Sequence, residues 1–346
     1  MKSILDVKSP NLKNESVIKL LSLYENRGKE FYYETIFKKD QKSFIASTIK
    51  DDLFYYCRYF ELDLTDNKIK LLTKSDLIPK NNTETIFLNL KKILYRIQNS
   101  ADTYELYASD ILTLNKLLNA NDSSIAFNTR EISDEGLLKK NESMVYELEN
   151  LLSEYKKLIT SKNYENIYIV SKLIVDFCND GYFNKGINNT SLIILYIVLI
   201  KHFKSLRYVS LFSILYELKD IFNNSLAQSK YFYSINVSDT LFLYEILLDI
   251  VYKSYLKLSS MAKEYDPNIK QKKTDNIEAT IDNLPNMFTK EQIRKEHPNI
   301  SDITIDRTLK RLKDELKIKP IGKGRSSLWQ KTNHNSSPHL TLFSDF

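Results

Sequence analysis

The sequence predicts a mostly α-helical protein with a large N-terminal domain and a small, basic C-terminal one. Glycine and proline are scarce, at six and seven of 346 residues. Apolar residues recur at helical spacing along most of the chain, and the positive charge is concentrated near the C-terminus. A chain of this length is long enough to bury two separate cores.

The charge distribution points to the C-terminal segment. Between Phe288 and Lys331 the chain has twelve Lys and Arg against six Asp and Glu, a net charge of +6. The whole chain also has a formal net charge of +6, so the remainder is neutral. A basic surplus confined to one small segment is typical of a nucleic-acid-binding module. From charge alone, a solvated charged face is the alternative.

Cysteine content and apolar run length exclude several classes of protein. Cys57 and Cys178 are too few for a disulfide framework, and the first residues do not form a basic-then-apolar leader, so we expect a cytoplasmic protein. The longest apolar run, Leu192 to Ile200, has nine residues, about half of the roughly 18 that cross a bilayer. We therefore expect a buried core helix there and no membrane partner. No spacing of Cys and His fits a metal site, and we expect none.

Residues 1–267 are predicted to form a single all-α domain. Eight segments carry apolar residues at helical spacing, with Asn, Ser or Asp near their ends as in capped helices. No internal repeat of fixed period is evident, which argues against a solenoid. The predicted helical segments are residues 14–37, 83–99, 100–121, 141–159, 164–180, 189–203, 211–226 and 238–262.

Residues 268–331 are predicted to form the second domain. The polar stretch at 263–276 contains a proline and predicts a linker, and residues 277–284 are expected to supply the first helix of the domain. Residues 289–296 predict a second, short helix. Residues 332–346 are assigned to a tail.

A third helix is predicted after a turn at residues 297–301. Ser301 is a suitable N-cap, and apolar residues then recur at spacings of four, three and four, which predicts one buried stripe of Ile305, Leu309, Leu312 and Leu316. The opposite face combines short hydroxyl donors with long cations, as a recognition helix in a DNA major groove does. The residues of this face are Thr304, Arg307, Thr308 and Arg311.

Residues 317–331 predict two short strands around a Gly-Lys-Gly-Arg turn, with Lys323 and Arg325 at its tip. Helix, turn, helix and basic hairpin together resemble a winged helix-turn-helix domain. This resemblance implies double-stranded DNA as the partner. A domain of this kind that mediates only protein contacts is the alternative.

The stretch DFCNDGYFNKGINNT, residues 176–190, holds two of the six glycines just before the most apolar segment. A glycine-containing loop before a helix is suited to an anion, because backbone N–H groups and the positive helix end converge there. Gly181 and Gly186 have the spacing of a P-loop. Ile187 and Asn188 stand where that motif needs Lys and Ser or Thr, which excludes a P-loop.

An apolar helix, a loop with a phenylalanine and a buried helix resemble the core of the Fic (filamentation induced by cAMP) family. The loop motif of this family is H-P-F-x-D-G-N-G-R-x-x-R, and its usual activity is transfer of AMP from ATP to a protein hydroxyl. The resemblance implies an all-helical Fic-like domain with a nucleotide-binding loop. The loop residues that it places in the motif are Gly181, Phe183, Lys185, Gly186, Asn188 and Asn189.

The aligned loop departs from the family motif at its reactive positions. Gly181 stands at the catalytic histidine, and Asn189 and Leu192 stand at the two arginines. Tyr182, Lys185 and Asn188 replace the proline, the acidic residue and the second glycine. In-line nucleotidyl transfer needs a base and cationic groups on the phosphate. The resemblance therefore implies a loop that keeps its structure but lacks the groups needed for catalysis, and we assign no catalytic residue.

Three further segments are similar to Fic family segments. Residues 45–52, IASTIKDD, resemble the inhibitory segment Ser-Ser-x-Ile-Glu-Gly, with Lys50 in place of the glutamate. Residues 111–121 resemble the segment I-x-x-L-H-x-x-L, with Asn115 in place of the histidine. Residues 126–133, AFNTREIS, are similar to the G-x-F-R-T-x-x-V that commonly follows it.

Two functions from different classes follow. The first is a DNA-binding, regulatory protein whose degenerate Fic-like domain senses a ligand, forms a homodimer or holds a protein partner, without a cofactor. The second is a divergent Fic-type protein adenylyltransferase, which would use ATP and Mg²⁺. The missing histidine and arginines favour the first function.

Overall fold

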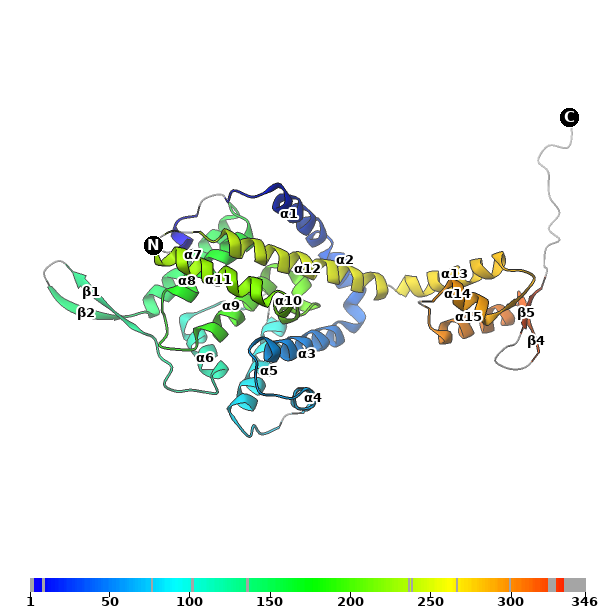
Figure 1. The fold of residues 1–346 in the computed structure, drawn as a ribbon, viewed down its shortest axis with the longest axis horizontal. Helices are drawn as coiled ribbons and strands as arrows, with labels where there is room; N and C mark the ends of the chain where they lie inside the picture. Colours follow the sequence, from blue (N-terminus) through cyan, green and yellow to red (C-terminus); the bar gives the residue numbers. More distant parts are fainter. Residues whose placement is uncertain are drawn as a thin grey trace, which may run out of the picture. The chain divides into compact units, whose positions relative to one another are not determined.

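The computed structural model describes residues 3–7, 10–75, 77–100, 103–134, 137–235, 237, 239–265, 267–298, 300–322 and 328–332. The chain divides into two compact units, Met1–Ala262 and Lys263–Phe346, which we call unit 1 and unit 2. The division falls a few residues before the predicted boundary at residue 267. Most of the described chain is helical (Figure 1), which confirms the predicted fold class.

Unit 1 consists of helices with one β-hairpin among its described residues. The helices are α1 Asn14–Arg27, α2 Glu30–Phe37, α3 Gln41–Tyr59, α4 Asp66–Lys74, α5 Asn82–Ser100, α6 Ala108–Leu118, α7 Val145–Ser161, α8 Asn166–Asn179, α9 Ile187–His202, α10 Leu211–Glu217, α11 Lys219–Ser234 and α12 Leu241–Tyr265, whose last turn belongs to unit 2. Short 3₁₀ helices cover Ser3–Leu5, Lys38–Asp40 and Lys204–Arg207. Strands β1 Thr129–Asp134 and β2 Leu137–Ser143 pair antiparallel.

Helix α9 lies at the centre of unit 1 (Figure 1), as the apolar run predicts. Every residue from Thr190 to Ile200 is buried, because a helix that is apolar all round must be covered on every side. Helices α6 and α8 both pack against it. Within the described residues, none of the helices combines the length and the apolar character that a membrane span requires.

Several predicted helices differ from the observed ones. The segment 14–37 breaks between α1 and α2 around Gly28, and the segment 211–226 breaks at Leu218. In the segment 100–121, Ser100 ends α5 and only Ala108–Leu118 form a helix of their own. The β1–β2 hairpin, which extends from the helical body (Figure 1), was not predicted.

Unit 2 contains three helices and a three-stranded antiparallel sheet among its described residues. The elements are α13 Pro267–Asn283, β3 Met287–Thr289, α14 Lys290–Glu296, α15 Asp302–Asp314, β4 Ile318–Ile321 and β5 Leu328–Lys331, with strand order β3-β5-β4. The linker predicted at 263–276 is wrong, because α12 runs to Tyr265 and α13 begins at Pro267. Proline is well suited to the first position of a helix.

The predicted helices of unit 2 are present, and their apolar residues form its core. Thr289 and Gln292 form a capping box at the start of α14, and Ser301 caps α15. Leu316 was expected in the buried stripe but is 69% exposed, because α15 ends at Asp314. The buried core residues are Ile277, Ile281, Phe288, Ile293, Ile305, Leu309, Leu312 and Ile318.

Candidate functional site

The loop between α8 and α9 has two glycines in the left-handed region of backbone conformation. Gly181 has a φ of +70° and Gly186 a φ of +82°, conformations that residues with a side chain rarely adopt. Gly186 is the N-cap of α9, and no side chain caps this helix end. The loop therefore presents an N-terminus whose first N–H groups are not closed off by a capping side chain.

Two asparagines of the α6 segment hold the end of the loop. Asn115 is fully buried and donates from Nδ2 to the carbonyl oxygen of Lys185 at 3.0 Å. Its Oδ1 accepts from Asn119 Nδ2 at 2.9 Å. A Cβ added to Gly186 would overlap with Asn115 Oδ1. The resemblance aligned Asn115 with the histidine of the segment I-x-x-L-H-x-x-L. In the structure Asn115 lies against the loop.

The middle of the loop pairs with the segment that leads into the β1–β2 hairpin. Phe183 forms a β-bridge with Phe127, and the centroids of the two rings lie 4.9 Å apart. Asn128 donates from its backbone N to Tyr182 O at 2.9 Å and from Nδ2 to Gly181 O at 2.7 Å. Asn184 Nδ2 donates to Ser124 O at 2.9 Å. These contacts fix the loop to residues 124–128.

Lys185 forms an ion pair that its sequence context does not indicate. Its Nζ lies 2.5 Å from Asp122 Oδ2. The hydrogen bond from Lys185 and those from Ser124 lower the pKa of the Asp122 carboxyl to about 2. Because Asp122 precedes the hairpin in an irregular segment, no spacing in the sequence links it to Lys185. The Lys185 ammonium group is therefore paired with a carboxylate of the protein itself.

Asn188 and Asn189 lie in the first turn of α9. Asn188 is exposed, Asn189 is half-buried, and Phe183 is buried. Among the described residues, no three His, Cys, Asp or Glu side chains form a group that could hold a metal ion. His202 lies at the opposite end of α9.

The segment that resembles the inhibitory motif lies within α3, where Lys50 is exposed. Its Asp52 is fully buried and accepts hydrogen bonds from Ser210 Oγ at 2.7 Å and the backbone N of Phe212 at 3.1 Å. Tyr196 OH of α9 also donates to Asp52, at 3.1 Å. Ser210 is the N-cap of α10. Asp52 therefore accepts one of the first N–H groups of α10.

The predicted DNA-facing residues of α15 do not all share one face. Arg307 is exposed and Thr304 half-buried, whereas Thr308 is 1% exposed and donates from Oγ1 to Thr304 O at 2.9 Å. The assignment of Thr308 to the exposed face is wrong, because in this helix it lies on the same side as Ile305 and Leu309. Lys323 and Arg325 lie outside the described residues.

Arg311 is exposed but held by carboxylates. Its guanidinium lies 2.7 Å from Glu278 of α13 and 3.1 Å from Glu315. Lys317 pairs with the same Glu278, at 2.5 Å. These partners raise the pKa of Arg311 and lower that of Glu278. Sequence periodicity could not show this cluster, since Glu278 is more than thirty residues away.

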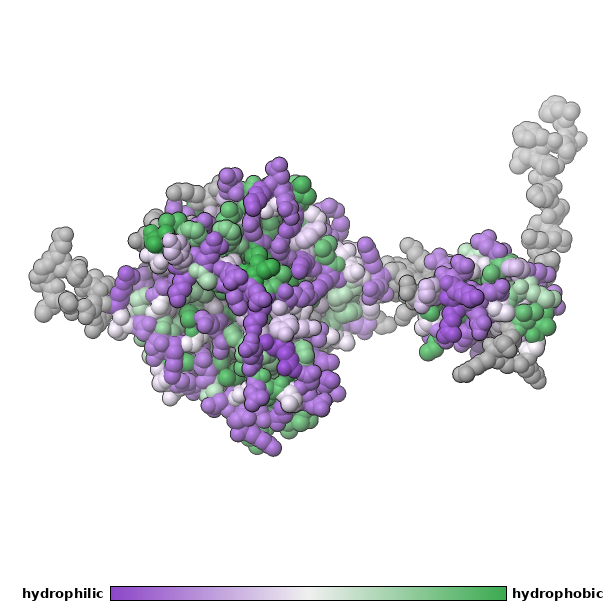
Figure 2. Space-filling view, in the orientation of Figure 1, coloured by the Kyte–Doolittle hydropathy of each residue, from purple (hydrophilic) through white to green (hydrophobic). Residues whose placement is uncertain are grey.

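Three exposed cations of α15 have no ion pair among the described residues of unit 2, namely Arg307, Lys310 and Lys313. Arg307 and Lys310 are three residues apart and so are neighbours on the helix surface. Neither Lys310 nor Lys313 was among the predicted residues. Hydrophilic residues dominate much of the visible face of unit 2 (Figure 2).

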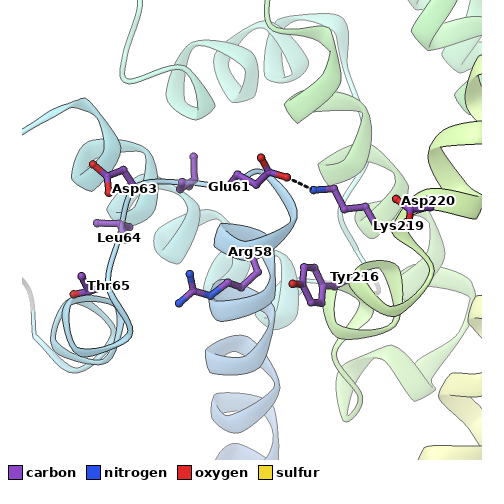
Figure 3. Close-up of a pocket in the computed structure, with 9 residues that line it drawn as sticks. Arg58, Glu61, Asp63, Leu64, Thr65, Tyr216, Lys219 and Asp220 are labelled. Atoms are coloured by element: carbon purple, nitrogen blue, oxygen red, sulfur yellow. Dashed lines mark hydrogen bonds and ion pairs between the residues drawn. The ribbon is translucent and has the colours of Figure 1, made fainter.

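An open hollow of about 810 Å³ lies where α3 ends. Asp63, Leu64 and Thr65 form one side, and Tyr216 and Lys219 lie across from them (Figure 3). Lys219 Nζ pairs with Glu61 Oε1 at 2.7 Å, so these two of its charged residues neutralise each other. We assign no ligand to this hollow.

Replacing Glu61 with glycine is expected to stabilise the protein by about 1 kcal/mol. Glu61 has a φ of +52° in the C-terminal cap of α3, where Leu62 N donates to Cys57 O at 2.9 Å. Its side chain is 81% exposed, so loss of the pair with Lys219 should matter little. Urea unfolding measures the change.

Glu61→Ala is the matched control, because it removes the ion pair and keeps a side chain at the left-handed position. We expect its stability to stay within about 0.5 kcal/mol of the wild type. An alanine variant as stable as the glycine variant would contradict the argument from backbone strain.

Comparison with known proteins identifies the fold. No family model and no curated protein matches the chain. A Fic family protein from Desulfovibrio desulfuricans G20 aligns over 94% of this chain and 98% of its own, with a TM-score of 0.52 and 11% identity. A Fic domain containing signaling protein from Bacteroides thetaiotaomicron VPI-5482 aligns over 70% of this chain and 97% of its own, with a TM-score of 0.53 and 14% identity. The chain therefore has a Fic-like fold.

Proposed function

We propose that this chain is a double-stranded-DNA-binding, regulatory protein in which a Fic-like body carries a winged helix-turn-helix domain. The observation that carries the proposal is the pair Arg307 and Lys310 on α15, exposed and without an ion-pair partner in the described part of unit 2. The order of α13, β3, α14, α15, β4 and β5 is consistent with a helix-turn-helix followed by a hairpin wing. The third helix, α15, would enter the major groove.

The charges around α15 support one contact surface. Lys290 and Arg294 of α14 pair with Asp306 and Asp302 on α15. These pairs neutralise two carboxylates that would otherwise repel phosphate. Arg307 has no ion pair among the described residues of unit 2, so its charge remains available to the DNA duplex.

In this proposal the Fic-like body is a scaffold that binds a ligand or a protein partner or forms a homodimer. Gly181 stands at the family's histidine position, and its neighbour Asp180 accepts from the hydroxyls of Tyr182 and Tyr233. Lys185 is paired with Asp122. In nucleotidyl transfer, a general base and unpaired cationic groups on the phosphate each increase the rate by a factor of about 10² to 10⁴.

A divergent protein adenylyltransferase is the second candidate. It is favoured by the loop itself, which keeps both glycines at positive φ and leaves the N-terminus of α9 without a capping side chain. Such a helix end can bind a phosphate. Transfer of labelled AMP from ATP with Mg²⁺ that is lost in Lys185→Ala would support this second function over the first.

DNA binding of the full chain is expected to fall at least about tenfold when Arg307 and Lys310 are both changed to alanine. Loss of two phosphate contacts should also reduce the slope of log affinity against log salt by about 2. Arg311→Ala should have a smaller effect, because Glu278 already holds that guanidinium. Fluorescence anisotropy with a labelled duplex at several salt concentrations measures both quantities.

The matched control is Lys74→Ala with Lys92→Ala, which removes the same charge from two exposed lysines of unit 1. We expect this control to bind DNA as the wild type does. Equal loss in both double variants, or no loss in either, would reject α15 as the DNA-binding helix. Circular dichroism checks that each variant remains folded.

A further inference from the structure

A pocket of about 380 Å³ lies at the C-terminal end of α9, opposite the end that meets the loop. Its walls come from α7, from residues 104–107 before α6, and from the last turns of α9. This volume is within the range of sites for small molecules. Neither the DNA-binding proposal nor the Fic-like loop uses it.

The inner wall of the pocket is apolar. Leu152 of α7 and Ile197 and Val198 of α9 line it and are buried, each at 7% exposure or less. Ile159 is half-buried beside them. Such a surface favours a hydrocarbon or aromatic body, which loses no hydrogen bonds when it leaves water.

One polar pair is uncharged at neutral pH. His202 Nε2 lies 3.0 Å from Tyr155 OH. Burial, together with the charges of Arg27 and Lys201, lowers the pKa of His202 to about 4. The imidazole is therefore neutral at pH 7, and it adds hydrogen-bonding capacity without adding charge to the pocket.

Most charged groups at the rim are matched within the protein. Lys156 Nζ donates to both carboxylate oxygens of Glu105, at 2.9 and 3.0 Å. Glu149 accepts from the backbone N of Ala108 at 2.8 Å, at the start of α6. There the positive helix end offsets the negative charge.

Among the charged groups at the rim of the pocket, Lys201 is the exception. Its Nζ donates to the neutral carbonyl oxygen of Tyr104 at 3.1 Å, and no ion pair joins it to another residue in the described part of unit 1. An ammonium group gains more from a carboxylate than from a carbonyl oxygen. The charge of Lys201 also helps to lower the pKa of Glu105, but no carboxylate lies within ion-pair distance of its Nζ in the described part of unit 1, so this ammonium group can pair with an anionic ligand.

We propose that this pocket binds a small apolar carboxylic acid, with the carboxylate at Lys201 and the apolar body against Leu152, Ile197 and Val198. A linear or an aromatic acid meets this description. The proposal stands independently of DNA binding and is tested without DNA.

The test uses the full chain at pH 7.5 with octanoate and indole-3-acetate, and with octanamide and indole-3-acetamide as uncharged analogues. Isothermal titration calorimetry is expected to show that each acid binds about tenfold more tightly than its amide. Lys201→Met should remove this preference while leaving amide binding unchanged. Ser153→Trp, at an exposed position that lines the pocket, should abolish binding of acids and amides alike.

Lys157→Met is the matched control, because Lys157 lies on α7 and pairs with Glu154. We expect it to bind each probe as the wild type does. Three results would overturn the proposal: no binding of either acid at millimolar concentration, equal affinity for acid and amide, or acid binding that survives Ser153→Trp. Thermal unfolding of each variant shows whether the fold is retained, so that a lost signal is not mistaken for a lost site.

Discussion

Replacing Gly186 with alanine is expected to destabilise the protein by roughly 3 kcal/mol or more. A φ of +82° costs about 1–2 kcal/mol for a residue with a side chain. The new Cβ would also overlap with Asn115 Oδ1 and lie 2.5 Å from Asn119 Nδ2. Because Asn115 is buried and hydrogen-bonded to Lys185 O, moving it breaks contacts worth about 1 kcal/mol each. Urea unfolding measures the loss.

Gly181→Ala is a matched control, since Gly181 has a similar φ of +70° but no atom within 4 Å of the added Cβ. We expect it to cost only the backbone strain, about 1–2 kcal/mol. In a second control, Asn115→Ala is combined with Gly186→Ala. The combination should cost less than the sum of the two single changes, because the first change removes the overlapping atoms. Equal losses for the two glycine variants, or strict additivity in the combination, would contradict this account of the loop.

The loop is the part of the site that the sequence predicts best. Gly181 and Gly186 were expected in a loop before the apolar helix, and they lie there, both at positive φ. Helix α9 was predicted from an apolar run that allows no exposed face. These are local properties of the chain, so they can be read without knowledge of the fold.

The contacts of the loop could not be predicted in the same way. Lys185 meets Asp122, and Phe183 meets Phe127, across separations of more than fifty residues. The β1–β2 hairpin escaped prediction because its strands contain Glu, Lys, Asn and Asp and lack strict apolar alternation. Long-range contacts of this kind follow from packing rather than from spacing.

In unit 2, periodicity predicted the core better than the surface. Ile305, Leu309 and Leu312 are buried as expected. Thr308 is small enough to fit beside them, and its hydroxyl bonds to Thr304 O, so residue type alone placed it on the wrong face. Arg311 has the predicted exposure, but its pair with Glu278 depends on α13, which the sequence indicated only in part.

The buried Asp52 network explains how a carboxylate is accommodated between α3, α9 and α10. Ser210, Phe212 and Tyr196 each donate to Asp52, and Gln98 Nε2 donates to Tyr196 OH at 2.6 Å. Three donors favour the ionised form, but complete burial opposes it more strongly and raises the pKa of Asp52 to about 7. Gln98 Oε1 has no partner among the described residues.

Asp52→Asn is expected to remove a pH dependence worth about 4 kcal/mol from the free energy of unfolding. The folded protein holds the Asp52 proton more tightly than the unfolded chain, where the pKa is about 3.9. The stabilisation from this group is therefore complete below about pH 4 and is lost as the pH rises to about 7. Asparagine is neutral throughout, and it keeps an acceptor for Ser210 and Phe212.

The measurement is urea unfolding of the wild type, Asp52→Asn and Asp51→Asn at intervals from pH 4 to pH 8. The wild type should lose stability relative to Asp52→Asn as the pH rises, most steeply between pH 4 and pH 7. Burial also raises the pKa of Asp51, and the charge of Asp51 contributes to the raised pKa of Asp52, so Asp51→Asn should remove a smaller part of the pH dependence than Asp52→Asn does. Parallel curves for the wild type and Asp52→Asn would mean that Asp52 stays ionised, and that its three donors outweigh the cost of burial.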